Sequence, residues 1–275
     1  MEKILTIYFS GTGNTKYIAK MFSARMNIRC LSIEDEAIFS DEIQAHDIIA
    51  VCYPNHTSRV PYIMREFVAK HMDAFEGKKI IIFITQVLFS GDGARVLCDL
   101  FPKGHIDVIY AEHFIMPINA GNIPLLSKTI LRKTSDKFNK KRRIIANAKM
   151  KLICRNIENG LIKKRGFSVV SRILGMIQGV PWQGSSKNVF ALRYTVQYRA
   201  KKMVWINSDC NACNLCVKHC PAKNLVNDND IITHKNNCTT CFRCVNICPK
   251  RAITVMFRMK PAWQYKGHCE TAYAE

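Results

Sequence analysis

Two cysteine-rich runs decide how this chain folds: CNACNLCVKHCP at Cys210–Pro221 and CTTCFRCVNICP at Cys238–Pro249. Each run has the spacing C-x2-C-x2-C-x3-C-P, and together they hold eight of the chain's 13 cysteines. Thiolate sulfur is a soft ligand, so four-cysteine sites of this kind select an iron–sulfur cluster or zinc. Three cysteines at two-residue intervals can surround one face of a cubane cluster, and a fourth ligand must then come from elsewhere.

The spacing resembles the ligand run of a bacterial two-cluster ferredoxin, in which the fourth cysteine of each run binds the cluster of the other run. This resemblance implies two [4Fe–4S] clusters. Pro221 and Pro249 end the runs and would turn each crossing cysteine towards the neighbouring cluster. The implied ligands are Cys210, Cys213, Cys216 and Cys248 for one cluster, and Cys238, Cys241, Cys244 and Cys220 for the other.

Two other uses of these cysteines fit the pattern less well. Zinc sites usually pair two C-x2-C knuckles across a longer gap and do not crowd four cysteines together twice, although zinc stays open as the weaker alternative. A disulfide framework is expected in secreted proteins, and cysteines this close together could not all reach partners within one fold.

The composition is that of a globular protein, but its charge is unevenly placed. The chain has 275 residues, 48% of them hydrophobic, which is enough for two ordinary domains. Residues 121–204 carry 20 Lys and Arg against 2 Asp and Glu, whereas residues 1–120 carry 12 against 14. The basic excess could steer an acidic redox partner or settle on anionic lipid. No nucleic-acid recognition motif accompanies it, so we expect no specific binding of nucleic acid.

The N-terminal residues predict a protein without a secretory signal. The short, mostly apolar run after Met1 is followed too soon by glycines to be one. No window reaches roughly eighteen consecutive apolar residues, so we expect no transmembrane helix, whereas peripheral contact with a membrane stays open. Thiolate ligands need a reducing environment, and we therefore expect a cytoplasmic protein.

The chain begins with a predicted strand at 3–9, a glycine-rich loop at 10–15 and a helix at 16–26. Backbone N–H groups of such a loop, and the helix N-terminus behind it, point at an anion. The loop lacks the lysine of a P-loop but carries three hydroxyls. It resembles the flavodoxin phosphate loop, Ser/Thr-x-Thr-Gly-x-Thr, which holds the FMN phosphate by neutral hydrogen bonds; the alternative is a turn that only caps the helix. Its residues are Ser10, Gly11, Thr12, Gly13, Asn14 and Thr15.

Strand-like and helical runs then alternate along the first 120 residues. The run at 79–86, KIIIFITQ, is apolar almost throughout, as expected for a strand with helices on both faces. The alternation predicts an α/β fold: a flavodoxin-like, doubly wound, five-stranded parallel sheet of order 2-1-3-4-5. The predicted strands are 3–9, 29–33, 47–53, 79–86 and 106–113, and further helices are predicted at 60–70 and 93–100.

Two further loops follow the third and fourth strands, at the carboxyl edge where ligands of such sheets bind. With the phosphate loop they correspond to the three FMN-contacting loops of a flavodoxin. Flavodoxin-like loops often place an aromatic ring near the position of His56, and this chain offers only an imidazole there. The predicted FMN contacts in these loops are Pro54, Asn55, His56, Thr57, Thr85, Gln86, Phe89, Gly91 and Asp92.

The whole chain resembles the family of EFR-type ferrodoxins, in which a flavodoxin-like domain precedes a two-cluster ferredoxin domain. The resemblance covers nearly all of the chain, including the TQ…FSGDGA loop at 85–94. It implies FMN and two [4Fe–4S] clusters as cofactors. The expected parts are a flavodoxin-like domain at 1–120, a basic helical extension or linker at 121–200, a small α+β ferredoxin domain at 201–260 and a C-terminal tail at 261–275.

The basic middle segment predicts two helices. One occupies most of 124–164, and the other, at 168–178, gathers apolar side chains on one face. The simplest expectation for the second is a helix packed between the two domains, and the alternative is a basic amphipathic segment at a membrane surface. The apolar residues concerned are Val169, Val170, Ile173, Leu174 and Ile177.

These features predict an electron-transfer protein in which two clusters pass single electrons to or from a flavin or a partner oxidoreductase. The sequence offers no proton-transfer dyad and no nucleophile–base pair, so we assign no catalytic residue and expect an electron carrier, which would be an oxidoreductase if it turns over a substrate. The alternative is an iron–sulfur binding or scaffold protein whose flavodoxin-like domain does not bind FMN and serves docking to a partner or a membrane surface.

Overall fold

The described residues form two compact units. The first contains the described residues of Met1–Met116 and Lys140–Pro181, and the second those of Pro117–Asn139 and Trp182–Gly267. The bounds of the four predicted segments stay a prediction. The computed structural model describes residues 2–56, 58–87, 89–122, 136–179 and 201–267.

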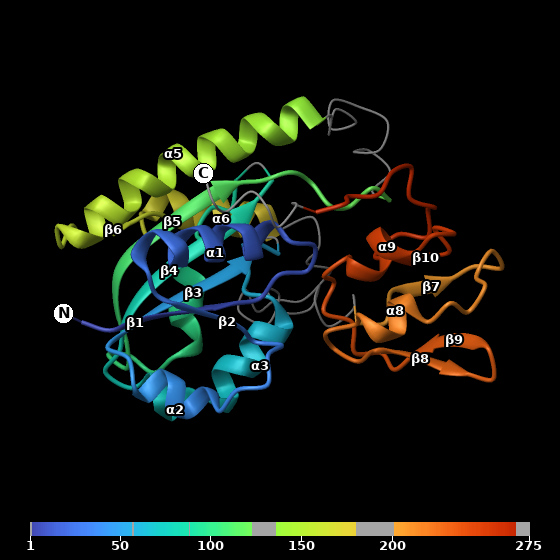
Figure 1. The fold of residues 1–275 in the computed structure, drawn as a ribbon, viewed down its shortest axis with the longest axis horizontal. Helices are drawn as coiled ribbons and strands as arrows, with labels where there is room; N and C mark the ends of the chain where they lie inside the picture. The colour runs from blue at the N-terminus through green and yellow to red at the C-terminus, as the bar shows by residue number, and fades with distance from the viewer. Residues whose placement is uncertain (1, 57, 88, 123–135, 180–200, 268–275) are drawn as a thin grey trace. The chain divides into compact units, whose positions relative to one another are not determined.

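The first unit is built on a parallel sheet with the strand order β2-β1-β3-β4-β5-β6 (Figure 1). The first five strands confirm the predicted order 2-1-3-4-5. The predicted number of five is wrong, because Lys163 and Lys164 form a sixth strand beside Tyr110 and Ala111. A strand of two lysines has no hydrophobic pattern from which it could be predicted. The strands are β1 (Ile4–Tyr8), β2 (Arg29–Ser32), β3 (Ile48–Pro54), β4 (Lys79–Gln86), β5 (Asp107–Ile115) and β6 (Lys163–Lys164).

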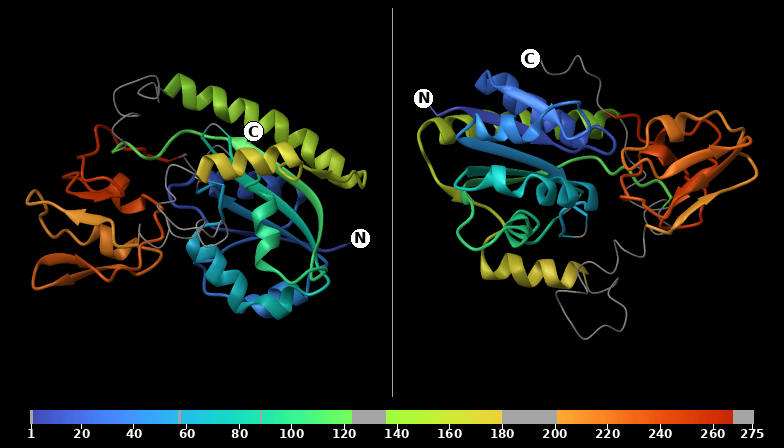
Figure 2. Two further views of the ribbon diagram at one scale, coloured as in Figure 1. Left: turned by 180° about the vertical axis from the view of Figure 1, so that it is seen from behind. Right: turned by 90° about the horizontal axis from the view of Figure 1, so that it is seen from below.

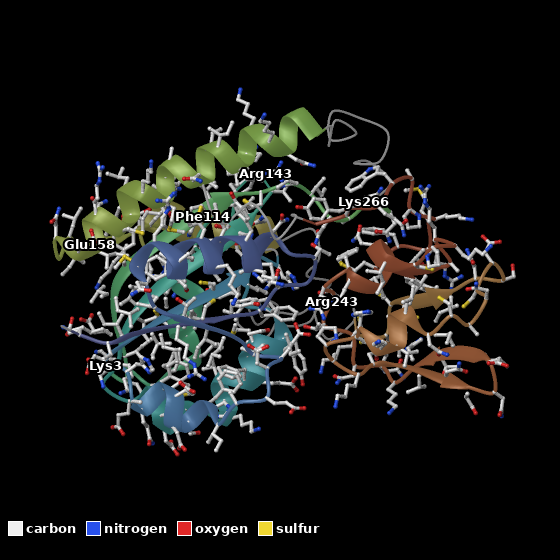
Figure 3. The ribbon with its side chains drawn as sticks, viewed as in Figure 1. Lys3, Phe114, Arg143, Glu158, Arg243 and Lys266 are labelled. Carbon is white, nitrogen blue, oxygen red and sulfur yellow. The ribbon has the colours of Figure 1, made fainter. Side chains whose placement is uncertain are left out.

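Helices α1 (Asn14–Met26) and α5 (Asp136–Glu158) pack their apolar sides into one hydrophobic cluster on the sheet. The Phe22 ring of α1 meets Phe83 of β4 edge to face, with 4.9 Å between the ring centroids. From α5, Met150 and Ile153 enter the same cluster, and Figure 3 shows Arg143 and Glu158 towards opposite ends of this helix. Apolar burial of this kind, worth about 1.5–3 kcal/mol per large side chain, holds α5 onto the sheet.

The remaining short helices of the first unit connect the strands. Ring contacts join Phe39 to Phe67 and Phe75 to Phe101, with centroids 4.8 Å and 5.4 Å apart. The helix predicted at 93–100 is a 3₁₀ helix and begins two residues later. These helices are α2 (Phe39–Gln44), α3 (Tyr62–Lys70), η1 (Met72–Phe75) and η2 (Arg95–Leu100).

Helix α6 (Val169–Gly179) lies on the face of the sheet opposite α1 (Figure 2). The five apolar side chains that the sequence places on one face of this helix are all exposed. Within its own unit, α6 contacts the loop after β4 through Gly175 and Gln178, and the expectation that it packs between the two domains stays a prediction. Among the described helices, none is both long and apolar enough to cross a membrane.

Glu112, in the middle of β5, ties the added elements to the sheet. Its carboxylate is buried and lies 3.0 Å from Lys149 of α5, 3.0 Å from Lys163 of β6 and 3.1 Å from Arg165. Burial alone would raise the pKa of this carboxyl. The hydrogen bond from the backbone N–H of His113 and the cationic neighbours outweigh burial and lower the pKa to about 2. One negative charge thus fixes the positions of α5 and β6 beside β5.

Replacing Glu112 by Gln should lower the free energy of unfolding by about 2 kcal/mol at pH 7, because three cations would lose their buried partner. The pKa is depressed in the folded state, so this stabilisation is fully present above the unfolded pKa of about 4.3 and is lost as the pH falls towards about 2. Urea unfolding followed by far-UV circular dichroism should therefore show a smaller difference between wild type and variant at pH 4 than at pH 7.

The matched control for this variant is Asp107→Asn. Asp107 is 67% exposed and its carboxylate lies 3.8 Å from the amine of Lys164, so its loss should change the free energy of unfolding by less than about 0.5 kcal/mol. Equal effects of the two variants would contradict the anchoring role of Glu112.

The second unit is a small α+β domain with two antiparallel strand pairs. Asn229 and Asp230, both with positive φ, form the two-residue turn of one hairpin. The elements are β7 (Val204–Ile206) paired with β10 (Ile253–Val255), β8 (Leu225–Asp228) paired with β9 (Ile231–His234), and helices α8 (Leu215–Lys218) and α9 (Arg243–Ile247).

Candidate cofactor sites

The two cysteine runs of the second unit share one backbone conformation. In each run, the residue directly before the short helix has positive φ. A residue further upstream and a residue after the helix also have positive φ, at equivalent positions of the two runs. Positive φ is uncommon for residues other than glycine and costs of order 1 kcal/mol each, so its repetition indicates a constraint common to both runs. The pairs are Ala212 and Thr240, Asn214 and Phe242, and Lys223 and Arg251.

Backbone N–H groups in these turns donate hydrogen bonds to cysteine sulfurs. The sulfurs of Cys220 and Cys248, the last cysteines of the two runs, each accept from the residue four positions later. Hydrogen bonds of this kind favour a thiolate and adjust the potential of a cluster bound to it. The donors are Asn224 to Cys220 at 3.2 Å, Thr240 to Cys238 at 3.3 Å and Ala252 to Cys248 at 3.3 Å.

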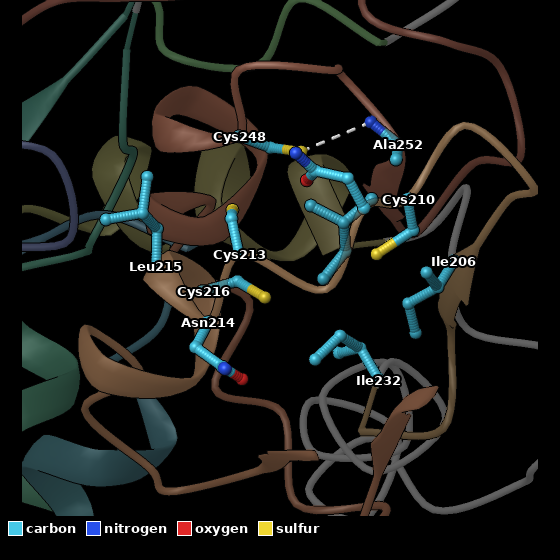
Figure 4. Close-up of a pocket in the computed structure, with 11 residues that line it drawn as sticks. Ile206, Cys210, Cys213, Asn214, Leu215, Cys216, Ile232, Cys248 and Ala252 are labelled. Atoms are coloured by element: carbon cyan, nitrogen blue, oxygen red, sulfur yellow. Dashed lines mark hydrogen bonds between the residues drawn. The ribbon is translucent and has the colours of Figure 1, made fainter. Parts of the chain in front are cut away.

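Each of two cavities in this unit is lined by three cysteines of one run and the last cysteine of the other. Figure 4 shows the first cavity, in which Cys248 joins the cysteines of the first run. Each hollow has a largely apolar wall, which includes Ile206 and Ile232 in one case and Val204 and Leu225 in the other. The cysteines are Cys210, Cys213, Cys216 and Cys248 around the first cavity, and Cys220, Cys238, Cys241 and Cys244 around the second.

Four thiols around an apolar hollow fit the donor set of a [4Fe–4S] cluster. Burial, followed by the neighbouring cysteines, raises the pKa of Cys216 to about 11 and that of Cys238 to about 12. Thiolates are therefore favoured here only where positive charge compensates them. All cysteines in the described part of the chain are free thiols, and no group of three His, Cys, Asp or Glu side chains among those residues could hold a single metal ion.

Polar side chains that the sequence analysis did not single out brace the second run. The Asn246 amide on α9 donates to the carbonyls of Asn119, at 2.7 Å, and of Phe242, at 2.8 Å, and its oxygen accepts from the N–H of Tyr265 at 2.6 Å. The Gln264 amide donates to two further carbonyls, including that of Cys248 at 2.7 Å. Residues from the ends of the unit thus fix the helix that carries Cys244.

Replacing Asn246 by Ala should leave the carbonyl of Asn119 and the N–H of Tyr265 without their side-chain partner. The loss of roughly 1.5 kcal/mol of hydrogen bonding should accelerate cluster loss about tenfold. The measurement is the decay of the visible cluster absorbance in the presence of an iron chelator. The control is Asn227→Ala, because the amide of Asn227 donates only to Asn214 at an exposed position. Equal decay rates in wild type and Asn246→Ala would contradict the bracing role.

The predicted phosphate loop lies between β1 and α1 in the first unit. Gly13 has a φ of 102° and donates its N–H to the hydroxyl of Ser10 at 3.1 Å. No side-chain hydrogen bond caps α1, and a helix N-terminus of this kind suits an anion. The Thr15 hydroxyl lies 2.8 Å from that of Thr85 at the end of β4, so the first and third loops meet.

The loop after β3 is joined to the loop after β4 by direct hydrogen bonds. The N–H of Asn55 donates to the carbonyl of Thr85 at 2.8 Å, and the Ser58 hydroxyl donates to the carbonyl of Ser90. Pro54 ends β3, and Thr57 lies outside the described residues. The three predicted loops therefore come together at the carboxyl edge of β1, β3 and β4.

Two predicted residues of the second loop have environments that suit a bound ring. Burial lowers the pKa of His56 to about 4, so its imidazole is neutral at pH 7. The side-chain oxygen of Asn55 is buried and has no hydrogen-bond partner among the described residues. An orphaned buried acceptor costs about 1–3 kcal/mol unless a ligand or water satisfies it.

The third loop is held in place by α6 and η2. Asp92 is fully buried, and its carboxylate pairs with Arg95 at 2.9 Å. A Cβ atom on Gly175 of α6 would lie 1.9 Å from this carboxylate, so only glycine fits against the loop. Gly91 has positive φ, the Gln178 amide donates to the carbonyl of Phe89 at 3.1 Å, and Gln86 ends β4. Neither Gly175 nor Gln178 could be identified from the sequence, because neither belongs to a motif.

Residues 5–115 match the family model described as a flavodoxin domain, and residues 202–249 match the model described as a 4Fe-4S dicluster domain. No curated protein matches the chain. The class of the molecule is therefore that of iron–sulfur and flavin electron-transfer proteins.

Solved structures similar to this chain include several flavodoxins. A Megasphaera elsdenii flavodoxin is 21% identical, with 40% of this chain and 84% of that one covered, at a TM-score of 0.36. A flavodoxin from the domain Archaea is 16% identical, with coverages of 55% and 98% and a TM-score of 0.35. A Lactobacillus acidophilus flavoprotein in complex with FMN is 14% identical, with coverages of 41% and 93% and a TM-score of 0.34.

The chain is a fusion of a flavodoxin-like domain and a 4Fe-4S dicluster domain. This confirms the two-domain organisation of the EFR-type ferrodoxins that the sequence resembles. The roles of the individual site residues stay predictions.

Proposed function

We propose that this chain is an electron carrier that passes single electrons through two [4Fe–4S] clusters to or from an FMN in its flavodoxin-like domain. The observation that supports this most strongly is the crossed arrangement of the cysteines, because each cavity has four sulfurs from two different runs. When bound, each cluster would supply a one-electron step and the FMN one or two, so paired electrons could be divided.

The proposed cluster ligands are the two sets of four cysteines that line the cavities. The chain's own contribution is to hold the sulfurs apart around an apolar space, to donate backbone N–H groups to three of them and to exclude water. The apolar wall and the raised pKa of Cys238 disfavour an isolated thiolate at this site. Binding of a cationic cluster core would stabilise the thiolates.

Crossed ligation makes a specific prediction about paired variants. Cys213→Ala and Cys248→Ala should each lose about four iron atoms, and the double variant should lose no more, because both residues would serve one cluster. Combining Cys213→Ala with Cys241→Ala should lose about eight. Iron and acid-labile sulfide are measured after anaerobic purification, with Cys154→Ala as a control in which all iron is retained.

The contrary outcome is equally specific. If Cys213→Ala with Cys248→Ala loses both clusters while each single variant loses one, the ligands do not cross and the assignment is wrong.

The proposed FMN site is the carboxyl edge where the three loops meet. Its phosphate would be held by the loop of Ser10–Thr15 at the N-terminus of α1. The neutral imidazole of His56 would contact the ring, and the buried oxygen of Asn55 would accept a hydrogen bond from it. A pyrimidine ring of the flavin offers the N–H donor that such an oxygen lacks.

Thr12→Val should weaken FMN binding about tenfold, because one hydroxyl hydrogen bond to a charged phosphate would be lost. Titration of the flavin-free protein with FMN, followed by quenching of flavin fluorescence, measures the change. Thr233→Val, an exposed substitution in the second unit, is the matched control and should leave the affinity unchanged. Unchanged affinity in Thr12→Val would remove this loop from the site.

The alternative function is that of an iron–sulfur scaffold whose flavodoxin-like domain binds no FMN. Anaerobic purification distinguishes the two: the proposed carrier contains about eight iron atoms and one FMN per chain. Iron without flavin, even after incubation with FMN, would leave the scaffold as the better account.

A further inference from the structure

His113 is a buried histidine that the proposed function does not use. It follows Glu112 in β5 and therefore lies on the other face of the sheet, because successive residues of a strand alternate between faces. The Nδ1 atom of its imidazole lies 2.8 Å from the hydroxyl oxygen of Ser90, in the loop after β4. Both side chains are buried, so water does not compete for this hydrogen bond.

The rest of the imidazole is enclosed by protein. Its Nε2 atom is buried and has no hydrogen-bond partner among the described residues. A Cβ atom on Gly166 would lie 2.9 Å from Nε2 and 3.3 Å from the carbonyl oxygen of Gly91, so Gly166 confines the ring and the third loop together. The bond to Ser90 is therefore the imidazole's one hydrogen bond within the part of the chain that the structure describes.

The imidazole is neutral at pH 7. Burial, followed by the positive charge of Arg165, lowers the pKa of His113 to about 4, and the carboxylate of Glu112 only partly opposes this. A neutral imidazole has one N–H donor and one acceptor nitrogen. It can therefore bond to the Ser90 hydroxyl without placing a charge behind the loop.

Ser90 joins β5 to two of the three loops at the carboxyl edge of the sheet. Its hydroxyl contacts His113, while its carbonyl accepts from the hydroxyl of Ser58 in the second loop and from the N–H of Gly93 at 2.9 Å. The residues on either side of it are predicted FMN contacts. A shift of Ser90 would therefore move groups of both loops.

We propose that His113 is a positioning residue for FMN: through Ser90 it holds the second and third loops in the arrangement that binds the flavin. This inference rests on the proposed function, and His113 itself would touch no cofactor. Helices α6 and η2 hold the third loop at Asp92, and His113 holds it two residues earlier, from the sheet. The loop is thus fixed from two directions, as a site needs when its geometry must be set before the ligand arrives.

The test is a double-mutant cycle in the affinity for FMN, measured by quenching of flavin fluorescence with the purified full chain. Ser90→Ala and His113→Leu should each weaken binding about fivefold, because each removes the buried hydrogen bond behind the loop. The double variant should also weaken binding about fivefold, since the two residues act through one contact, whereas independent residues would give about 25-fold. His113→Asn should recover most of the lost affinity, because its amide places a hydrogen-bonding atom where Nδ1 lies.

The matched control is Ser23→Ala in α1. Ser23 is also buried, and its hydroxyl donates to that of Thr6 at 2.8 Å, but neither residue belongs to the three loops. The two serine variants should lower the free energy of unfolding by similar amounts, and only Ser90→Ala should weaken the binding of FMN. If His113→Leu does not fold, this pair of serine variants decides the question alone.

Hydrogen exchange in the flavin-free protein measures the position of the loop directly. The N–H of Gly93 donates to the Ser90 carbonyl, and it should exchange about fivefold faster in Ser90→Ala than in the wild type. In Ser23→Ala this amide should exchange as it does in the wild type.

Three results would overturn the inference: a double variant weakened about 25-fold, equal FMN affinities of Ser90→Ala and Ser23→Ala, or faster exchange at Gly93 with unchanged FMN affinity. A wild type that binds no FMN would overturn the proposed function instead, and this inference with it.

Discussion

The crossing of the two cysteine runs is the constraint on which the second unit depends. Cys248 lies with the cysteines of the first run and Cys220 with those of the second, so neither cavity is complete without both halves. The chain accepts positive φ at equivalent residues of both runs to achieve this. With only short strands and helices, this unit has little apolar core, and metal binding would supply folding energy that the side chains lack.

The first unit depends on a different constraint, the meeting of three loops at one sheet edge. Parallel strands end at the same edge, so the loops after β1, β3 and β4 converge whatever their sequences. The hydroxyl contact of Thr15 with Thr85 and the backbone bond from Asn55 to Thr85 then fix them to each other. Glu112 anchors α5 and β6 at the far strand, and α6 supports the third loop from outside.

Much of this arrangement could be predicted from the sequence, because it follows from spacing and periodicity. The resemblance to a two-cluster ferredoxin implied the four cysteines that line each cavity, and the apolar runs predicted five strands within two residues and their order. The features that could not be predicted have no local signal in the sequence. The strand β6 consists of two lysines, and Asn246 and Gln264 act through carbonyls distant in the chain. Periodicity identified the apolar face of α6 but not the direction in which it points.

The measurement that tests the central claim most directly is an anaerobic reductive titration of the purified chain, followed by visible absorbance and electron paramagnetic resonance. The account predicts an uptake of about four electrons per chain, two at the flavin and one at each cluster, with both cofactor signals arising from the same protein. Uptake by iron alone, or an iron content too low for two clusters, would contradict it.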